Sequence, residues 1–208
     1  SSGMISYHQL SNIQLDALKE VGNIGAAHAA TALSQIINKT VMISVSRIDI
    51  IPIAQIAQVV GGPQAQTAVV QMRILGDVVG VILLALKKED ALSFADTLKG
   101  QVIGTAVELE KLEQSALKEA GSILAASYLK AIGGFLKFSL IPSTPNLIFN
   151  KMGEIMDEVL RELAKRVEIA FCIETEFKEP ASSINGHFLL IPEVKSLEAM
   201  LKALGLVG

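Results

Sequence analysis

The sequence predicts a mixed α/β (α+β) protein in which two α-β-(α)-β-β-α units share a mainly antiparallel, six-stranded sheet covered by helices. Two twelve-residue stretches, 16–27 and 115–126, are identical at eight positions with a constant offset of 99. A second match, in the same order, aligns residues 80–84 with 186–190. Half of the 208 residues are apolar, which is enough for one shared core. We therefore expect a single domain over about residues 10–204, with repeats at about 11–100 and 105–204.

The first copy begins with a long helix and continues with strands. Ser11 and Gln14 fit a capping box ahead of the helix. Gly76-Asp77 is a turn signal between the last two strands, and Gly100 suits the position that ends the closing helix. The predicted elements are a helix over 12–37, a strand over 41–51, a short helix over 53–60, strands over 68–75 and 78–86, and a helix over 88–99.

The second copy follows the same order. Thr105 and Glu108 fit another capping box, so its long helix is predicted to start near Ala106 and to end at Gly133-Gly134. Residues 150–165 carry an apolar stripe at helical spacing, which favours a core helix and leaves partner docking as the alternative. The remaining predicted elements are strands over 136–141, 167–177 and 186–191, and a last helix over 194–204.

Composition excludes several classes of protein. The net charge is −3, aromatic residues make up 4%, and no Lys/Arg cluster is present, which argues against a nucleic-acid partner. The single cysteine, Cys172, lies in an apolar run and is predicted to be a buried hydrophobic residue. Three well-separated histidines give no metal-ligand spacing, so we expect neither a metal site nor a cofactor of the protein's own.

Nothing in the chain predicts membrane insertion or secretion. The longest uncharged stretch, 50–72, contains prolines, a Gly-Gly pair and several glutamines, unlike a membrane-spanning helix. No secretory signal precedes the first helix, and Ser1-Ser2-Gly3 before Met4 looks like residues left by cloning. We expect a soluble, cytoplasmic protein.

A polar stripe on the first long helix is the candidate site. Asp16, Glu20 and Asn23 are spaced i, i+4 and i+7 and therefore lie on one face of a helix, which we expect to be exposed. Leu15, Leu18 and Ile24 are predicted to face the core.

Two glycines, Gly22 and Gly25, flank Asn23 on this helix. Glycine costs about 1 kcal/mol in a helix interior relative to alanine, so both positions need a reason. Close packing within the protein and close approach of another macromolecule are the two alternatives.

The string Asp16-x-x-x-Glu20-x-x-Asn23 resembles the signature of the CheC/CheX/FliY chemotaxis phosphatases: an Asp or Ser, a Glu, an Asn and a downstream Gly. The context from Lys19 to Ala26 is also typical of that family. The duplication resembles the CheC branch, since CheX carries one motif. The resemblance covers about residues 10–204.

The resemblance implies hydrolysis of the aspartyl phosphate on the response regulator CheY. Asn23 would orient a water for in-line attack, and Glu20 would pair with a lysine of the regulator. This role suits the residues, because phosphoryl transfer needs positioning and charge neutralisation more than covalent chemistry. The regulator would supply Mg²⁺ and the phosphoaspartate, so this chain would need no cofactor.

The second copy departs from the pattern. Ser115 and Glu119 keep the register, but Ser122 stands where the family has Asn, and the downstream Gly is alanine in both copies. We expect a degraded second site that retains partner-binding residues, with Asp16 in the same role on the first helix. If the two helices present equivalent ridges, Ser122→Asn would add activity.

A second function is compatible with the resemblance. CheC proteins also bind CheD, a receptor glutamine deamidase, and FliM-like relatives are scaffolds of the flagellar switch. A binding module for CheD or a switch scaffold, without strong catalysis, is therefore the alternative. The Glu20/Asn23 pair favours the enzyme, because a scaffold has no need of a carboxamide one turn beyond a carboxylate.

Overall fold

The computed structural model describes residues 12–163, 166–179 and 182–203. Within them, seven strands form one antiparallel sheet in the order β1-β6-β7-β3-β2-β4, with β5 also paired to β2. The strands are β1 (Met42–Pro52), β2 (Gln66–Gly76), β3 (Gly80–Lys87), β4 (Leu140–Pro142), β5 (Asn146–Lys151), β6 (Ile169–Glu179) and β7 (Ser182–Pro192). The helices are α1 (Asn12–Ile37), η2 (Ile53–Gln55), α2 (Ile56–Val59), α3 (Lys88–Leu98), α4 (Lys111–Leu136), α5 (Met152–Leu163) and α6 (Val194–Ala203).

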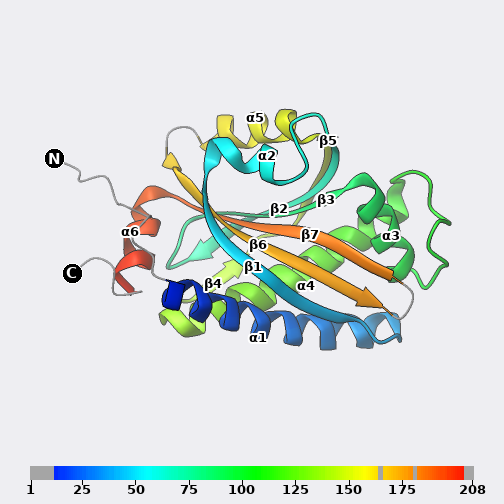
Figure 1. Cartoon of the computed structure of the whole chain (residues 1–208), viewed down its shortest axis with the longest axis horizontal. Coiled ribbons are helices and arrows are strands. Elements are labelled where there is room, and N and C mark those ends of the chain that lie inside the picture. Colours follow the sequence, from blue (N-terminus) through cyan, green and yellow to red (C-terminus); the bar gives the residue numbers. More distant parts are fainter. Residues whose placement is uncertain (1–11, 164–165, 180–181, 204–208) are drawn as a thin grey trace.

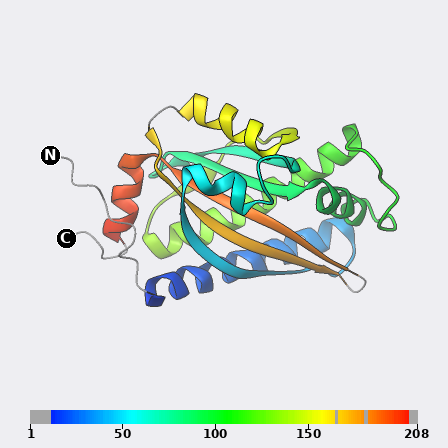
Figure 2. The same ribbon diagram turned by 45° about the horizontal axis from the view of Figure 1, so that its top comes forward.

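The helices cover both faces of the sheet. The long helices α1 and α4 lie side by side across one face, and α2 and α5 lie on the other (Figures 1 and 2). Each face has its own apolar cluster, because β3 is buried along almost its whole length and contributes alternate side chains to both. This arrangement confirms the predicted fold class.

The sheet is symmetric about its central pair of strands. Leu83 of β3 pairs directly with Leu189 of β7, and these two residues are equivalent in the match between 80–84 and 186–190. A pseudo-twofold axis therefore passes between them. The helices α1 and α4 are both 26 residues long and begin 99 residues apart, which is the offset between the two motif-bearing stretches.

The start of α4 corrects one prediction. The helix begins at Lys111 and not near Ala106, and Glu110 at its N-cap makes no side-chain capping bond. The buried carboxylate of Asp96 instead accepts hydrogen bonds from the backbone N–H groups of Gly104 and Ala106, at 3.0 Å each. The Thr105 hydroxyl donates to the Val102 carbonyl, so Thr105 belongs to a turn and not to a capping box.

The end of α4 corrects another. The helix runs through Gly133-Gly134 and ends at Leu136, with Lys137 in the left-handed region at φ 61°. Gly133 belongs to the terminating turn, because its carbonyl accepts the N–H of Phe138 at 2.8 Å. A Cβ at Gly133 would lie 2.5 Å from the Phe138 carbonyl oxygen, so only glycine fits. Gly133 is therefore required by the turn that ends the helix at Leu136, although the helix does not end at the glycine itself.

The strand predicted over 136–141 is wrong in extent. The edge position beside β2 is divided between β4 and β5, with Ser143 bridging the break through hydrogen bonds of 2.8 Å to and from the backbone of Arg73. Because β4 and β5 share one position beside β2, the sheet has seven strands where six were predicted, but still six positions side by side. Asn150 belongs to β5, so the next helix starts at Met152.

The apolar stripe of α5 is core, as the sequence favoured. Met152, Ile155, Met156, Val159 and Leu163 are buried, and Leu160 packs against them. Ser11, Lys165 and Leu204 lie outside the described residues, so the first capping box and two predicted helix ends stay untested.

Candidate functional site

The exposed ridge of α1 carries two carboxylates. Asp16 and Glu20 both project into solvent, one helical turn apart. Neither forms an ion pair with another described side chain. Both groups are therefore available to a cationic partner.

Asn23 does not stand on the open ridge, which corrects the expected exposure. It is half-buried, and its carboxamide is directed at the edge strand β1. Its Oδ1 accepts the backbone N–H of Val45 at 2.9 Å, and its Nδ2 donates to the carbonyl of Lys19 at 3.1 Å and more weakly to that of Val45 at 3.5 Å. The structure thus holds the carboxamide in one orientation beside Glu20.

The local sequence explains why α1 approaches β1 so closely. A Cβ at Gly22 would lie 3.3 Å from Cγ2 of Val45, so the missing side chain lets the helix pack tightly against this strand. Among the described strands, β1 has a neighbour only on its other side, β6, and the pairing with β6 shifts register between Val45 and Arg47. Asn23 therefore satisfies backbone groups of an edge strand at a β-bulge.

The second glycine is explained by helix packing. A Cβ at Gly25 would lie 3.0 Å from the carbonyl oxygen of Ser127 and 3.2 Å from Cα of Tyr128 on α4. Of the two reasons considered for Gly22 and Gly25, close packing within the protein accounts for both positions.

Ile24 is exposed, and the prediction that it faces the core is wrong. Its exposed fraction is 56%, whereas Leu18 on the same helix is 6% exposed. At about 100° per residue, four residues carry the helix about 40° past a full turn, so Ile24 lies close to Glu20 around the helix. That spacing was a signal in the sequence for an isoleucine on the ridge.

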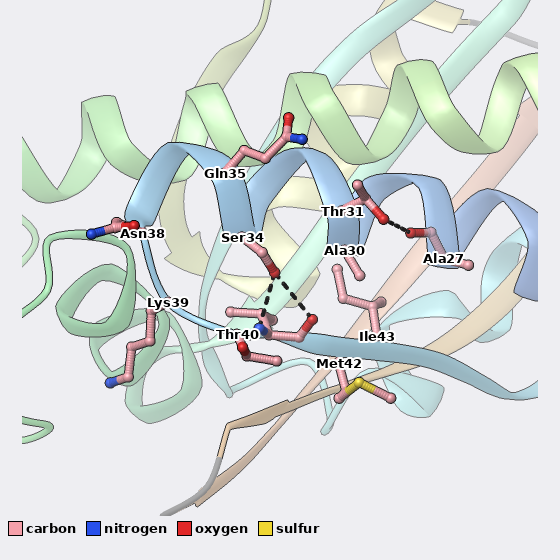
Figure 3. A pocket seen from close by; sticks show the side chains of 11 residues that line it. Ala27, Ala30, Thr31, Ser34, Gln35, Asn38, Lys39, Thr40, Met42 and Ile43 are labelled. Carbon is pink, nitrogen blue, oxygen red and sulfur yellow. Dashed lines mark hydrogen bonds between the residues drawn. The ribbon is translucent and has the colours of Figure 1, made fainter.

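Two open grooves follow the seam between α1 and β1, on either side of Asn23. The smaller has a volume of about 380 Å³ and is lined by Leu15, Asp16, Lys19, Ser46, Arg47 and Ile48. The larger, of about 690 Å³, runs from Ala27 to Gln35 on the helix and along 38–43 on the other side (Figure 3). In it the hydroxyl of Ser34 bonds to both the N–H and the carbonyl of Val41.

The second copy places its residues differently. Ser115 and Glu119 are exposed, as Asp16 and Glu20 are, and Ser122 is half-buried. A Cβ at Gly121 would lie 2.8 Å from Cγ1 of Val70, so at this residue α4 packs on β2, whereas Gly22 of α1 packs on the edge strand β1. Among the described contacts, the Ser122 hydroxyl has no bond comparable to that of Asn23 with Val45.

The single cysteine and the metal-ligating side chains give no further candidate site among the described residues. Cys172 is buried, and burial raises the pKa of its thiol to about 12, which fits a buried apolar residue. Within the described ranges, no three His, Cys, Asp or Glu side chains are placed to hold a metal ion. The helices of the described chain include none long and apolar enough to span a membrane.

The fold and site together define a class: a duplicated α/β protein that carries a carboxylate and a carboxamide on a surface helix. The model of the CheC-like family matches residues 13–45, which contain this motif and β1 up to Val45. Over 206 residues the chain is 30% identical to the CheY-P phosphatase CheC of Bacillus subtilis, covering 97% of this chain and 99% of that protein.

Two further likenesses agree. The flagellar motor switch phosphatase FliY of Bacillus subtilis is 30% identical over 112 residues, or 53% of this chain and 29% of FliY. The crystal structure of Thermotoga maritima FliY superposes with a TM-score of 0.77 at 19% identity, covering 95% of this chain and 98% of that one. The chain belongs to the CheC-like family, which confirms the resemblance seen in its motifs.

Proposed function

We propose that this protein is a phosphatase that hydrolyses the aspartyl phosphate of a CheY-type response regulator in the cytoplasm. One observation carries the proposal: the Glu20/Asn23 pair lies on a helix ridge, in a chain that matches a CheY-P phosphatase over almost its whole length. The regulator docks on α1, and the chemistry takes place at the regulator's phosphorylation site.

Glu20 supplies the electrostatic contact in this proposal. Its carboxylate is exposed and has no ion pair within the described part of the chain, so a lysine of the regulator can approach it directly. Such a pair fixes the register of docking and suppresses wrong partners. Asp16, one turn earlier, adds a second negative charge to the same docking surface.

Asn23 supplies the positioning contact. The bond from Val45 uses one lone pair of its Oδ1 and leaves the other for a water molecule. The water oxygen forms the new bond to phosphorus while the bond to the aspartyl oxygen breaks, giving a free aspartate and inorganic phosphate. A carboxamide does not titrate, so it holds water equally well across the physiological pH range. The regulator supplies the Mg²⁺ that neutralises the phosphoryl oxygens.

The experiment is decay of phosphorylated Bacillus subtilis CheY with wild type and with Asn23→Ala. We expect Asn23→Ala to lose most of the stimulated decay, about 10²-fold or more, because misplacing one positioned group is worth that much. The matched control is Ser122→Ala, at the same position of the second copy, which should keep nearly full activity.

Asn23→Ala also unpairs backbone groups of Val45, so its stability must be measured alongside. We expect a loss of about 1 kcal/mol, which leaves the protein folded. Asn23→Asp keeps an acceptor for the Val45 N–H and serves as a second variant. Full activity in a folded Asn23→Ala protein would contradict the proposal.

A further inference from the structure

Ile24 is an apolar side chain placed between charged and polar neighbours on the proposed docking ridge. It follows Asn23 directly and lies one turn beyond Glu20, with exposed His28 one turn further on. Its exposed fraction is 56%, whereas Leu18 and Leu33 of the same helix are buried. Single exposed apolar residues are ordinary on protein surfaces, so exposure alone decides nothing.

The second copy shows that this exposure is not a consequence of the helical position. Ile123 is the equivalent residue of α4, and it is half-buried and packs against the core. The difference follows from the placement of the helices, since Gly121 packs on β2 while Gly22 packs on the edge strand β1. The isoleucine is exposed in the copy that carries Asn23 and half-buried in the copy that carries Ser122.

We infer that Ile24 is the apolar contact that seats the phosphorylated regulator on α1. This inference rests on the proposed function and names how the partner is recognised. The partner surface it fits has an aliphatic or aromatic depression next to a cationic side chain, so that Ile24 is buried while Glu20 is paired. Continuity with Glu20 identifies the occupant, because Ile24 lies one turn beyond Glu20 and only about 40° around the helix from it, next to the side chain that the regulator is proposed to contact.

A matched control exists on the same helix. Ile36 has an exposed fraction of 55%, almost equal to that of Ile24. It lies twelve residues further along, about 18 Å away at 1.5 Å per residue, and on another side of the helix. Truncating either isoleucine removes the same atoms from an equally open position, so the two variants differ only in their distance from the motif.

The test combines binding and turnover with Bacillus subtilis CheY as the probe. The dissociation constant is measured for beryllofluoride-activated CheY, which does not turn over, and KM and kcat are measured with phosphorylated CheY. For Ile24→Ala we expect about a tenfold rise in dissociation constant and KM, with kcat within about twofold of wild type. Ile36→Ala should match wild type, and Ile24→Leu should restore most of the affinity.

The outcomes separate this inference from the proposed function. If Asn23→Ala abolishes turnover while Ile24→Ala binds as wild type does, the docking inference is wrong and the phosphatase remains. A loss of kcat at constant KM in Ile24→Ala would also overturn it, because the residue would then act through Asn23. If Ile24→Ala weakens binding but Asn23→Ala retains full turnover, the chemistry assigned to Asn23 is wrong while the docking surface stands. Failure of wild type to bind activated CheY would overturn the docking inference outright.

Discussion

The side-chain oxygen of Asn23 accepts a hydrogen bond of 2.9 Å from the backbone nitrogen of Val45. The motif residue is therefore also a cap on the edge of the sheet. Ser34 makes the same kind of contact with Val41, the residue directly before β1. Unpaired strand edges invite pairing with other chains, and side chains of α1 protect this one at Val45 and at the residue that leads into it.

The pairing proposed for Glu20 predicts a charge effect. Glu20→Lys should weaken binding of activated CheY by at least about 100-fold, because like charges at an interface cost several kcal/mol. Glu20→Gln loses the attraction without adding repulsion and should weaken binding by about tenfold. Titration calorimetry measures both. Glu119→Lys, on the equivalent ridge of α4, is the control and should bind normally; equal affinity for wild type and Glu20→Lys would contradict the pairing.

The second copy should stay inactive even when its motif is completed. The sequence alone predicts that Ser122→Asn adds activity if α1 and α4 present equivalent ridges. The structure removes that condition, because α4 packs on β2 at Gly121 and the edge strand beside it is broken at 143–145. We expect Ser122→Asn in an Asn23→Ala background to restore no CheY-P decay, with stability changed by about 0.5 kcal/mol or less. Recovery of decay would show that the Val45 contact is dispensable.

Replacement by alanine should have opposite effects on the free energy of unfolding at two glycines of α4. Gly121→Ala places a Cβ 2.8 Å from Val70 and should destabilise the protein by about 1–3 kcal/mol despite the better helix propensity. Gly134 has open space around it, so Gly134→Ala should stabilise by about 0.5–1 kcal/mol. Urea unfolding of both variants decides the matter, and a destabilised Gly134→Ala would argue against the described end of α4.

Stability should fall in mild acid because of His187. Burial lowers the pKa of this imidazole, against an opposing contribution from Glu174, whose Oε1 is 3.7 Å from Nε2. The unfolded state then binds the proton more tightly, so stability is lost as the pH falls below about 6.5 and levels off below the folded pKa. Urea midpoints at about pH 7 and pH 5 should differ less in His187→Gln than in wild type. His28→Gln, at an exposed position, should leave the difference unchanged.

Local patterns in the sequence were sufficient for most of the fold. The bounds of α1 at 12–37 and the apolar face of α5 both follow from helical periodicity. The start of α4 was not predictable from the local motif, because the carboxylate of Asp96 on α3 binds the backbone N–H groups of Gly104 and Ala106 in the loop that precedes the helix.

The candidate site was predicted as residues and not as geometry. Spacing placed Asp16 and Glu20 correctly on an exposed ridge. It could not reveal that Asn23 turns toward Val45, because the edge position of β1 depends on the order of strands in the sheet. Ile24 was misassigned because an apolar residue was taken for core, although its spacing from Glu20 placed it on the ridge.

The pairing of Leu83 with Leu189 at the pseudo-twofold axis has a consequence for how the two copies diverge. Each half supplies one of the two central strands, so neither copy can be lost without opening the shared core. The surface chemistry of the two long helices is under no such joint requirement. Under the proposed function, the motif is needed on one helix only, so serine at Ser122 of the other helix is tolerated while folding still depends on both halves.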